Sequence, residues 1–397
     1  MATKAEWTAF IELAKSADIF VVAKDLLCDL KKVGVNEFAG PCPMDGGRDR
    51  FSLNSRKQVF NCRGSDDGGK GDVISLCRHV TGCSFPEALE RITGQRRPDS
   101  TRDETIDERA ERLKKNALRI EASRRRQEAE IAQAEVRARH EEEAVSKIID
   151  RAVAIQGTHA ESYVVERGLT ISKRHSPDLR FVDKLEYWGV PDNGTKELVC
   201  LGAVPALIAI IRNVYGDVIG ISQTFLDPKE PRKWLPEGSH RNSPKKVRGK
   251  KQGGMIRLGR TGAKLAIGEG WENPLAWWQM AQNYIDPDVT LAAAVDIGNL
   301  CGGALGKVQH PTATDPDGAR ERMPSGLPDP DAPGVIIPDG VQHIILICDA
   351  NSDGYKTAAF YRTAVNRFQD AGIKVDLAWP PAGYDWNDIL KKELEHA

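Results

Sequence analysis

Residues 343–354 read HIILICDANSDG, a short apolar run that ends on Asp349 and is followed by a polar turn. A similar run at residues 265–270, LAIGEG, ends on Glu269. Short runs of this kind, bounded by glycine and each followed by a helical pattern, are typical of βα units in a parallel sheet. The two helices are expected at residues 271–284 and 355–371. The sequence therefore predicts an α/β fold in this part of the chain.

The two acidic residues are predicted to lie close together despite their separation in the sequence. In a parallel sheet, ligands bind beyond the carboxyl ends of the strands, so Glu269 and the cluster at Asp349 would share one crevice. Carboxylate oxygens that converge in this way bind hard cations such as Mg²⁺ or Mn²⁺, usually with phosphate groups completing the shell. The pattern therefore predicts a divalent-metal site.

These residues resemble the Toprim domain, the metal-binding fold of bacterial primases, topoisomerases and some nucleases. Its signature is a Glu after one strand and Asp-x-Asp-x-x-Gly after a later strand, and the matching positions here are Glu269 and residues 349–354. Asn351 stands where the family has its second Asp. This change removes one formal charge and should weaken metal binding unless Asp353 or Glu272 compensates.

The resemblance runs from about residue 264 to the C-terminus. It includes Asp385-Trp386-Asn387-Asp388, which follows a strand-like stretch at residues 375–379 and looks like the ending of phage- and plasmid-type Toprim primases. The resemblance implies a Toprim parallel-sheet domain at the C-terminus of a multi-domain α/β chain. It also implies that the catalytic residues are Glu269, Asp349, Asn351 and Asp353, with Glu269, Asp349 and Asp353 as ligands of Mg²⁺ or Mn²⁺.

The N-terminal region carries a second family pattern. Cys42, Asp45, Cys62 and Ser65 have the spacing Cys-x2-Asp-x16-Cys-x2-Ser, which matches a zinc-ribbon template with two ligands replaced. The surrounding glycines, the Arg-Asp-Arg-Phe stretch at residues 48–51 and the Gly-Asp pair are similar to the zinc ribbon that precedes the catalytic domain of phage and bacterial primases. In that family all four ligand positions are normally Cys or His.

Structural zinc prefers four Cys or His ligands in a closed tetrahedron. The expected ligand set is Cys42, Asp45, Cys62 and Asp66, with Asp67 as the alternative to Asp66, because the hydroxyl of Ser65 is a poor zinc ligand. Since two of these positions are carboxylates, we expect the protein to carry less than one zinc ion per chain. Another cluster, Cys77, His79 and Cys83, lies on or beside an amphipathic helical pattern at residues 73–80, which favours packing over metal binding.

Residues 96–147 form a break in composition, because Arg, Glu, Ala and Gln dominate and large apolar residues are scarce. Opposite charges interleave along residues 108–143, and such pairs support a solvated helix. The helix is either a semi-rigid spacer that lets the ribbon sample a template, or a surface helix with no part in binding. Sustained apolar heptads are missing, which argues against a coiled coil.

Residues 205–221 predict a β-hairpin that turns at Gly216-Asp217. Residues 229–257 follow, rich in Lys and Arg among Gly, Ser and Pro, and predict a basic loop that follows nucleic-acid phosphates. This region is similar to the small domain that precedes the Toprim region in phage-type primases. The candidate nucleic-acid-binding residues are Arg48, Arg50, Arg232, Lys233, Lys245, Lys246, Arg248, Lys250 and Lys251. The alternative is an ordinary solvated surface.

An insertion at residues 310–340 is rich in Pro, Asp and Gly, which opposes regular structure. It is either a lid over the crevice or a disordered loop, and disorder is the default expectation.

The chain as a whole has 397 residues, a net charge of -1 and eight Cys without paired spacing. These values indicate local basic patches and reduced thiols, and the lack of an apolar leader or spanning segment predicts a cytoplasmic protein without membrane contact.

The sequence predicts four parts: a zinc-ribbon domain at residues 1–95, a charged helical spacer at 96–147, a mixed α/β nucleic-acid-binding domain at 148–262 and a Toprim domain at 263–397. The implied activity is that of a DNA primase, which makes RNA primers on a single-stranded DNA template from nucleoside triphosphates. A Toprim-type nuclease and a non-catalytic replication protein with degenerate metal sites are the alternatives. Because no Gly-x4-Gly-Lys-Ser/Thr motif occurs, unwinding is assigned to a separate replicative helicase.

Overall fold

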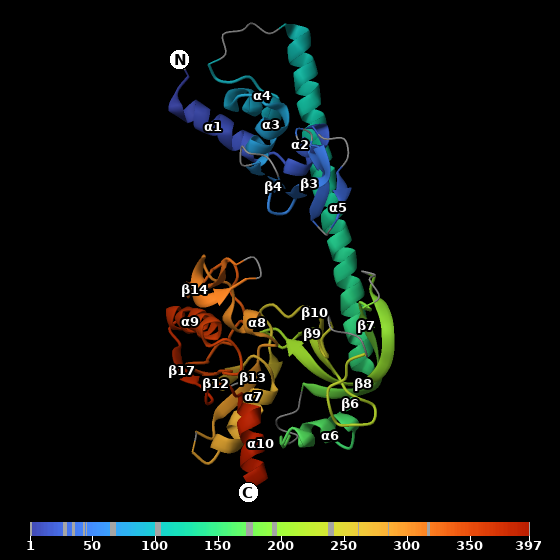
Figure 1. Ribbon diagram of the computed structural model, residues 1–397, viewed down its shortest axis with the longest axis vertical. Coiled ribbons are helices and arrows are strands. Elements are labelled where there is room, and N and C mark those ends of the chain that lie inside the picture. The colour runs from blue at the N-terminus through green and yellow to red at the C-terminus, as the bar shows by residue number, and fades with distance from the viewer. Residues whose placement is uncertain are drawn as a thin grey trace. The chain divides into compact units, whose positions relative to one another are not determined.

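Figure 1 shows the computed structural model of the chain, which divides into two compact units, Met1–Val136 and Arg137–Ala397. The structure describes residues 2–26, 30–33, 36–42, 44, 46–63, 69–99, 105–171, 178–192, 197–236, 242–260, 262–284, 286–315 and 318–396. Helices and strands mix in both units, which confirms the predicted α/β character. Within the described residues, none of the helices combines the length and apolar character needed to cross a membrane.

The first unit packs helices against an antiparallel sheet. The helices are α1 (Lys4–Lys15), α2 (Ile19–Leu26), α3 (Val73–Thr81) and α4 (Phe85–Thr93); the strands, in sheet order, are β1 (Lys31–Lys32), β2 (Glu37–Cys42), β3 (Gly46–Asn54), β4 (Val59–Cys62) and β5 (Lys70–Gly71). Asp72 caps α3 by accepting from the backbone N–H groups of Ile74 and Ser75, and Gly82 ends the helix at a φ of 65°. Phe51, Phe60 and Leu76 are buried in the core between sheet and helices.

The predicted charged helix is present as α5 (Ile106–Arg151), and the boundary between the two units falls inside it. Ion pairs such as Glu121–Arg125, at 2.7 Å, run along its exposed surface. In the first unit, Arg126 pairs with Asp18 at 2.9 Å, and its guanidinium lies 4.1 Å from the centre of the Phe20 ring. This part of α5 therefore packs on the ribbon domain through a specific contact.

The second unit begins with an antiparallel sheet in the order β10-β9-β8-β7-β6. Its elements are β6 (Val153–Ala154), α6 (His159–Glu166), β7 (Leu179–Gly189), β8 (Val199–Arg212), β9 (Val218–Phe225) and β10 (Lys245–Gly249). Strands β8 and β9 form the hairpin predicted from residues 205–221. The predicted basic loop is wrong for residues 245–249, because they form β10, an edge strand paired antiparallel with β9. The side chains of residues 245–248 alternate between the two faces of the sheet. The composition from which a loop was predicted did not indicate this alternation.

The last sheet has the order β11-β13-β12-β16-β17. Its strands are β11 (Ile256–Arg257), β12 (Lys264–Gly268), β13 (Val289–Ala293), β16 (His343–Ile347) and β17 (Lys374–Ala378), and its helices are α7 (Glu272–Ala281), α8 (Ile297–Cys301), α9 (Gly354–Asp370) and α10 (Trp386–His396). Strands β13, β12, β16 and β17 pair in parallel, and β11 is antiparallel to β13. Ala266 packs into one core and its neighbours Leu265 and Ile267 into another, so both faces of the sheet are covered.

The default expectation of disorder for residues 310–340 is wrong for its first part. Strands β14 (Lys307–Thr314) and β15 (Arg320–Pro324) form an antiparallel hairpin. The turn is held by Asp315, whose backbone carbonyl accepts from the N–H of Gly318 at 2.9 Å. Asn366 of α9 donates to the carbonyl of Gly326 at 2.9 Å, just beyond the hairpin. Contacts to α9 thus supply the order that a composition rich in Pro, Asp and Gly did not predict.

Candidate functional site

Glu269 and Asp349 lie at the same edge of the last sheet. Glu269 directly follows β12, and Asp349 follows β16 after Cys348. These strands are parallel neighbours, and Gly268 pairs with Ile347 in the ladder. The acidic residues that the sequence placed in one crevice are therefore brought to neighbouring strand ends, as the rule for parallel sheets requires.

The pKa values of these acids show that negative charge is crowded at this edge. Burial raises the pKa of Asp349 to about 7, and the nearby charges of Glu269 and Asp385 contribute to the rise. Burial also raises the pKa of Glu269, helped by repulsion from Asp296, and burial raises the pKa of Asp385. Partly buried carboxylates that repel one another are the donor set a hard divalent cation neutralises, so these residues fit Mg²⁺ or Mn²⁺.

Asp296 is a further acidic residue that the sequence analysis did not single out. It follows β13, the other parallel neighbour of β12, and it caps α8 by accepting from the backbone N–H of Asn299 at 2.9 Å. Lys251 donates to its second oxygen. Val295, just before it, has a φ of 79°, which a β-branched residue rarely adopts. The sequence contained a signal for Asp296, because the strand-forming stretch at β13 is also followed by an acidic residue.

Asp353 has a different environment from Asp349. It caps α9, where its Oδ1 accepts from the backbone N–H of Lys356 at 2.8 Å, and the same oxygen lies 3.0 Å from Nε2 of His310. Nδ1 of His310 accepts from the backbone N–H groups of Thr312 and Ala313, so Nε2 carries the proton and donates to Asp353. These hydrogen bonds, first that of Lys356, lower the pKa of Asp353. One of its oxygens is therefore already engaged in holding the hairpin against α9.

Asn273 and Asn387 hold Asp349 in place. The side-chain amide of Asn273 donates to Oδ1 of Asp349. The carbonyl oxygen of Asn273 in turn accepts from the backbone N–H of Asn387 at 3.3 Å, and Asn387 donates to the carbonyl of Arg167 at 2.7 Å. The Asp-Trp-Asn-Asp stretch thus contributes a buried Asn that positions the site, and Asp385 adds charge to it.

Glu272 forms the centre of a buried ionic cluster next to the acidic edge. Its Oε2 lies 3.2 Å from Nζ of Lys245 and 3.5 Å from Nζ of Lys233, and its Oε1 accepts from the hydroxyl of Tyr163. Burial alone would raise the pKa of Glu272, but Lys245, Lys233 and Arg167 outweigh it and lower the pKa to about 2. The charge of Lys245 also acts on Glu269 and Asp349. Glu272 is therefore balanced by lysines rather than available as a free metal ligand.

The predicted nucleic-acid-binding residues fall into separate places. Lys245 and Lys251 lie at the acidic edge, paired with Glu272 and Asp296. Neighbouring side chains of a strand point to opposite faces, and Lys246 accordingly lies 4.0 Å from the Tyr187 ring centre. On the same strand Arg248 pairs with Glu141 at 3.4 Å. The remaining members are Lys233 beside Glu272, Arg232 paired with Asp227 and Glu230, Lys250 just after β10, and Arg50, which is exposed on β3.

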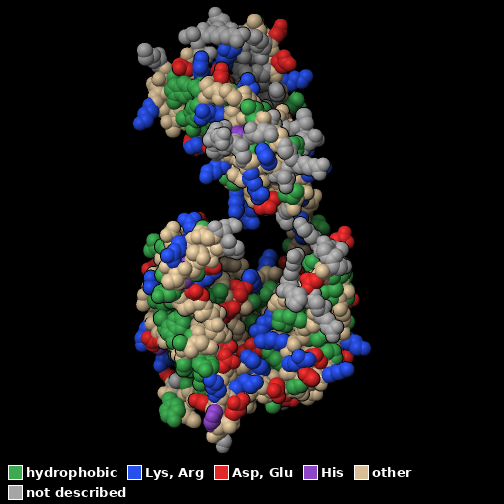
Figure 2. Space-filling model, viewed as in Figure 1, with side chains coloured by type: hydrophobic (Ala, Val, Ile, Leu, Met, Phe, Trp, Pro, Cys, Tyr) green, Lys and Arg blue, Asp and Glu red, His purple; other side chains and the backbone are tan. Residues whose placement is uncertain are grey.

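Figure 2 shows Asp and Glu side chains beside Lys and Arg side chains on one face of the second unit. Lys245 and Lys251 are each paired with an acid, Glu272 and Asp296. An anionic ligand that binds here has to compete with these carboxylates for the lysines, unless a cation neutralises the acids first. The arrangement can therefore bind a phosphate chain together with a divalent ion better than either alone.

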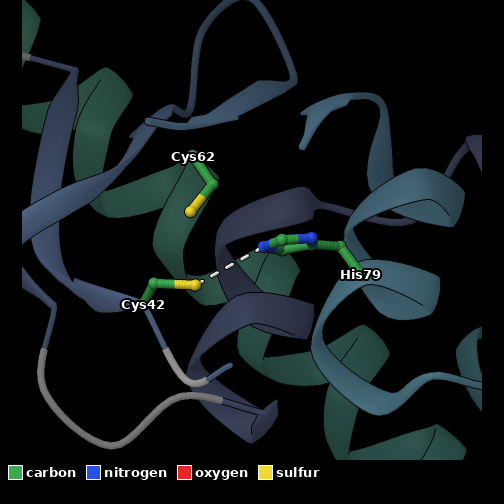
Figure 3. A group of neighbouring side chains, drawn as sticks. All are labelled: Cys42, Cys62 and His79. Carbon is green, nitrogen blue, oxygen red and sulfur yellow. Dashed lines mark hydrogen bonds between the residues drawn. The ribbon is translucent and has the colours of Figure 1, made fainter. Parts of the chain in front are cut away.

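A separate metal-binding arrangement lies in the first unit (Figure 3). Cys42 of β2, Cys62 of β4 and His79 of α3 are buried, and their ligand atoms all lie within 4.8 Å of one another. Sγ of Cys42 is 3.5 Å from Nε2 of His79. Zinc bonds of about 2.3 Å to sulfur and about 2.0 Å to nitrogen place two such atoms about 3.5 Å apart across a tetrahedral ion. The three residues therefore fit zinc.

His79 is a candidate ligand that the sequence analysis assigned to packing. It is buried, as that interpretation expects, and its ring centre lies 5.5 Å from that of Phe60, but its imidazole also faces the two thiols. Asp45 and Asp66, the two carboxylates proposed as ligands, lie outside the described residues, as does the side chain of Arg48. Within the described residues, only Cys42, Cys62 and His79 form a group of three or more potential metal ligands that lie this close together. The acidic residues at the strand ends are farther from one another.

Comparison with known proteins gave two family matches. Residues 7–108 match the family model described as CHC2 zinc finger, the zinc ribbon of DnaG, and residues 139–258 match a domain of unknown function, DUF7146. No curated protein sequence matches the chain.

The chain is similar to the solved structure of the zinc-binding and RNA polymerase domains of the Aquifex aeolicus primase. The sequence identity is 16% and the TM-score is 0.36, and the match covers 98% of this chain and 84% of that chain. The primase fragment of the bacteriophage T7 primase-helicase protein matches at 13% identity and a TM-score of 0.30, over 58% of this chain and 70% of that one. Together, the family match at residues 7–108 and the Cys42, Cys62 and His79 cluster indicate that the N-terminal part of the chain is a zinc ribbon of the DnaG primase kind.

Proposed function

We propose that this chain is a DNA primase of phage or mobile-element kind, which synthesises short RNA primers on single-stranded DNA by metal-dependent nucleotidyl transfer. The observation that carries the proposal is the position of Glu269 and Asp349 at neighbouring parallel strand ends, in a chain whose residues 7–108 match a CHC2 zinc finger of DnaG. The acidic edge suits phosphoryl chemistry, and the zinc ribbon suits recognition of a template.

The proposed organisation has four parts. Residues 1–95 are the zinc ribbon, residues 96–147 the helical spacer, residues 148–262 the nucleic-acid-binding domain and residues 263–397 a Toprim domain. The order of acids along the last sheet supports the Toprim assignment, because one acid follows β12 and the next follows its parallel neighbour β16. The contact of Arg126 with Asp18 ties the spacer to the ribbon.

In this proposal, Glu269 and Asp349 hold Mg²⁺ or Mn²⁺, with Asp296 and Asp385 adding negative charge around them. A bound divalent ion would neutralise the phosphates of a nucleoside triphosphate and stabilise the charge that develops at the α-phosphate. Asn273 orients Asp349 through its amide hydrogen bond. Asp353 fixes the start of α9 beside the site, and Asn351 offers a neutral oxygen ligand at the exposed rim.

Lys245 is the basic residue best placed to act on the same substrate. It pairs with Glu272, and its positive charge partly offsets the rise in the pKa values of Glu269 and Asp349. When a triphosphate binds with its cation, Lys245 is close enough to the acidic edge to share its charge with a phosphate oxygen. The template backbone would follow Lys250, Lys251 and the neighbouring cations.

Zinc is proposed to bind in the ribbon through Cys42, Cys62 and His79. The 3.5 Å separation between Sγ of Cys42 and Nε2 of His79 supports this set over the Cys and Asp set expected from spacing alone. Zinc there would crosslink β2 and β4 to α3 and so hold a small domain together.

A primer-synthesis assay tests the proposed activity. The purified chain is incubated with single-stranded DNA, labelled ribonucleotides and Mg²⁺, and the products are separated by length beside a cleavage assay on the same DNA. We expect short RNA products from the wild type and none from Glu269→Gln or Asp349→Asn, while Glu186→Gln, a change at a surface carboxylate of β7, leaves synthesis intact.

Two other results would point to the alternatives. DNA cleavage that depends on the same two acids, without RNA synthesis, would identify a Toprim-type nuclease. Binding of single-stranded DNA without either reaction would identify a non-catalytic replication protein, and the replacement of an acid by Asn351 is the feature that favours this outcome.

A further inference from the structure

A groove of about 520 Å³ opens beside Asp349. One side is formed by the loop that follows β16, with Asp349, Ala350 and Asn351, and the other by the loop that follows β17, from Trp379 to Gly383. Most of the lining residues are small or polar, so a flat ring can enter without displacing a large side chain. Trp379 is the one large aromatic side chain among the lining residues.

The two loops are joined by backbone hydrogen bonds. The N–H of Cys348 donates to the carbonyl of Ala378 at 2.9 Å, and the N–H of Ala350 donates to that of Tyr384 at 3.1 Å. In return, the N–H of Gly383 donates to the carbonyl of Ala350 at 2.8 Å. These bonds place the residue after Ala378, which is Trp379, next to Asp349 and fix the shape of the groove before any ligand binds.

Trp379 packs on Tyr361 and is partly exposed. Its ring centre lies 5.3 Å from that of Tyr361, with the rings at 73°, and the Tyr361 hydroxyl donates to the carbonyl of Ile347 in the core. Even so, Trp379 remains 39% exposed. A large aromatic side chain costs free energy when it stays in water, and an exposed indole beside charged groups is typical of a binding surface.

We propose that Trp379 stacks on an unpaired nucleobase whose phosphate is held at the acidic edge through a divalent cation bound by Asp349 and Glu269. This inference rests on the proposed function and deepens it, because it names the part of the ligand that the groove receives. Every base offers a π-face, so stacking of this kind accepts all of them. The base belongs either to the incoming nucleotide or to the single-stranded template, and both present the same flat ring next to a phosphate.

The test compares ligands with and without a base. Binding to the full chain is measured by calorimetry with Mg²⁺ present, using ATP against inorganic tripolyphosphate, and oligothymidylate against an abasic oligonucleotide of equal length. The variants are Trp379→Ala and Trp379→Phe. Tyr284→Ala is the control, because Tyr284 is an aromatic residue outside the proposed nucleic-acid-binding domain, is 89% exposed and does not line the groove.

We expect Trp379→Ala to weaken binding of ATP, of oligothymidylate or of both by about tenfold and to leave the base-free partner of each unchanged. Trp379→Phe should retain most of the affinity, and Tyr284→Ala all of it. Weaker binding of ATP alone assigns the groove to the incoming nucleotide, and weaker binding of oligothymidylate alone assigns it to the template.

The inference is wrong if Trp379→Ala binds both base-containing ligands as the wild type does, or if tripolyphosphate binding falls as much as ATP binding. It is also wrong if the wild type binds neither base-containing ligand more tightly than its base-free partner. Because these measurements need no turnover, they are independent of primer synthesis. A chain that stacks bases through Trp379 but makes no RNA refutes the primase proposal alone, and RNA synthesis with unaltered Trp379→Ala binding refutes the stacking alone.

Discussion

Nζ of Lys245 lies 3.2 Å from Oε2 of Glu272, so a lysine on the edge strand of one sheet is paired with a buried carboxylate on the first helix of the next. Lys233 shares the same oxygen at 3.5 Å. Two cations and one buried anion leave a net positive charge beside Glu269 and Asp349, which carry the opposite charge. The pair therefore joins the antiparallel sheet to the acidic edge both structurally and electrostatically.

Glu272→Gln should destabilise the second unit by about 2–4 kcal/mol, because Lys233 and Lys245 lose the anion that compensates their partial burial. The free energy of unfolding is measured by urea denaturation. Glu141→Gln is the control, because it removes an exposed pair with Arg248 and should cost less than about 1 kcal/mol. Equal effects of the two changes would contradict the central role of Glu272.

In a chelator, the folded chain should lose stability as the pH rises from about 4 to about 7. The pKa of Asp349 is about 7 in the folded state against an ordinary value of 3.8, so the folded state keeps a proton that the unfolded state releases in this range. Asp349→Asn should remove a large part of this pH dependence, leaving the part due to Glu269 and Asp385, whose pKa values are also raised. It should raise the melting temperature at pH 8 by about 2–4 °C. Thermal unfolding at pH 5 and pH 8 checks the sign, and a wild-type protein more stable at pH 8 would refute it.

His79→Ala should release most of the zinc from the ribbon, because it removes one of three buried ligands. Zinc per chain is measured by elemental analysis after gel filtration, and Cys42→Ser should act in the same way. Cys83→Ser is the control, since Cys83 lies close in sequence but outside the cluster. Full zinc content in His79→Ala would show that His79 is not needed for zinc binding and would favour the carboxylates at positions 45 and 66 as ligands.

Asn351→Asp should tighten Mg²⁺ or Mn²⁺ binding about tenfold, because it adds an exposed carboxylate to the groove that contains Asp349. Calorimetric titration with the metal measures this change. Asn351→Ala adds no charge and should bind the metal no more tightly than the wild type. Affinity for single-stranded DNA in chelator should be the same for all three proteins, and unaltered metal affinity in Asn351→Asp would place position 351 outside the metal site.

Lys245→Gln combined with Lys251→Gln should weaken single-stranded DNA binding. The log–log salt dependence of the affinity should flatten by roughly 0.7 for each phosphate that the variant no longer neutralises. Both lysines lie at the acidic edge, whereas Lys246 and Arg248 lie on the other face of β10. Lys246→Gln combined with Arg248→Gln is therefore the matched control. A larger change in slope from that second pair would place the strand of DNA on the opposite face.

The strands and helices of the acidic edge were predictable because their signals are local. The runs at residues 265–268 and 343–347 are apolar for the length of one strand, and each ends at the point where the chain leaves the sheet. Asp296 obeys the same rule, and a search of every strand end would have found it. The hairpin at residues 307–324 was missed because its order depends on His310 and Asp353, which meet only in the folded chain.

Ligands supplied by another element are harder to predict. His79 lies in the helix after the ribbon strands, and spacing rules for zinc search only within the loops that normally carry ligands. The ion pair of Lys245 and Glu272 is hard to predict for the same reason. From the sequence, Lys245 is expected to be a surface charge and Glu272 to begin a helix, and nothing indicates that they meet. In each case the sequence shows both residues, and the fold determines that they meet.

Val295 places backbone strain directly before one of the acidic residues of the site. A β-branched residue at a φ of 79° costs on the order of 1–3 kcal/mol, and a glycine would follow the same backbone path without that penalty. The valine, however, narrows the conformations open to Asp296, which lies beside Glu269. Val295→Gly would relieve this strain, but it would also remove the packing of the side chain on the core and give the unfolded chain more freedom. Its clearest effect should therefore be a loss of geometric definition in the carboxylates. Val295 is therefore a residue whose side chain is kept in a costly backbone conformation by its packing, and that packing helps to define where Asp296 lies.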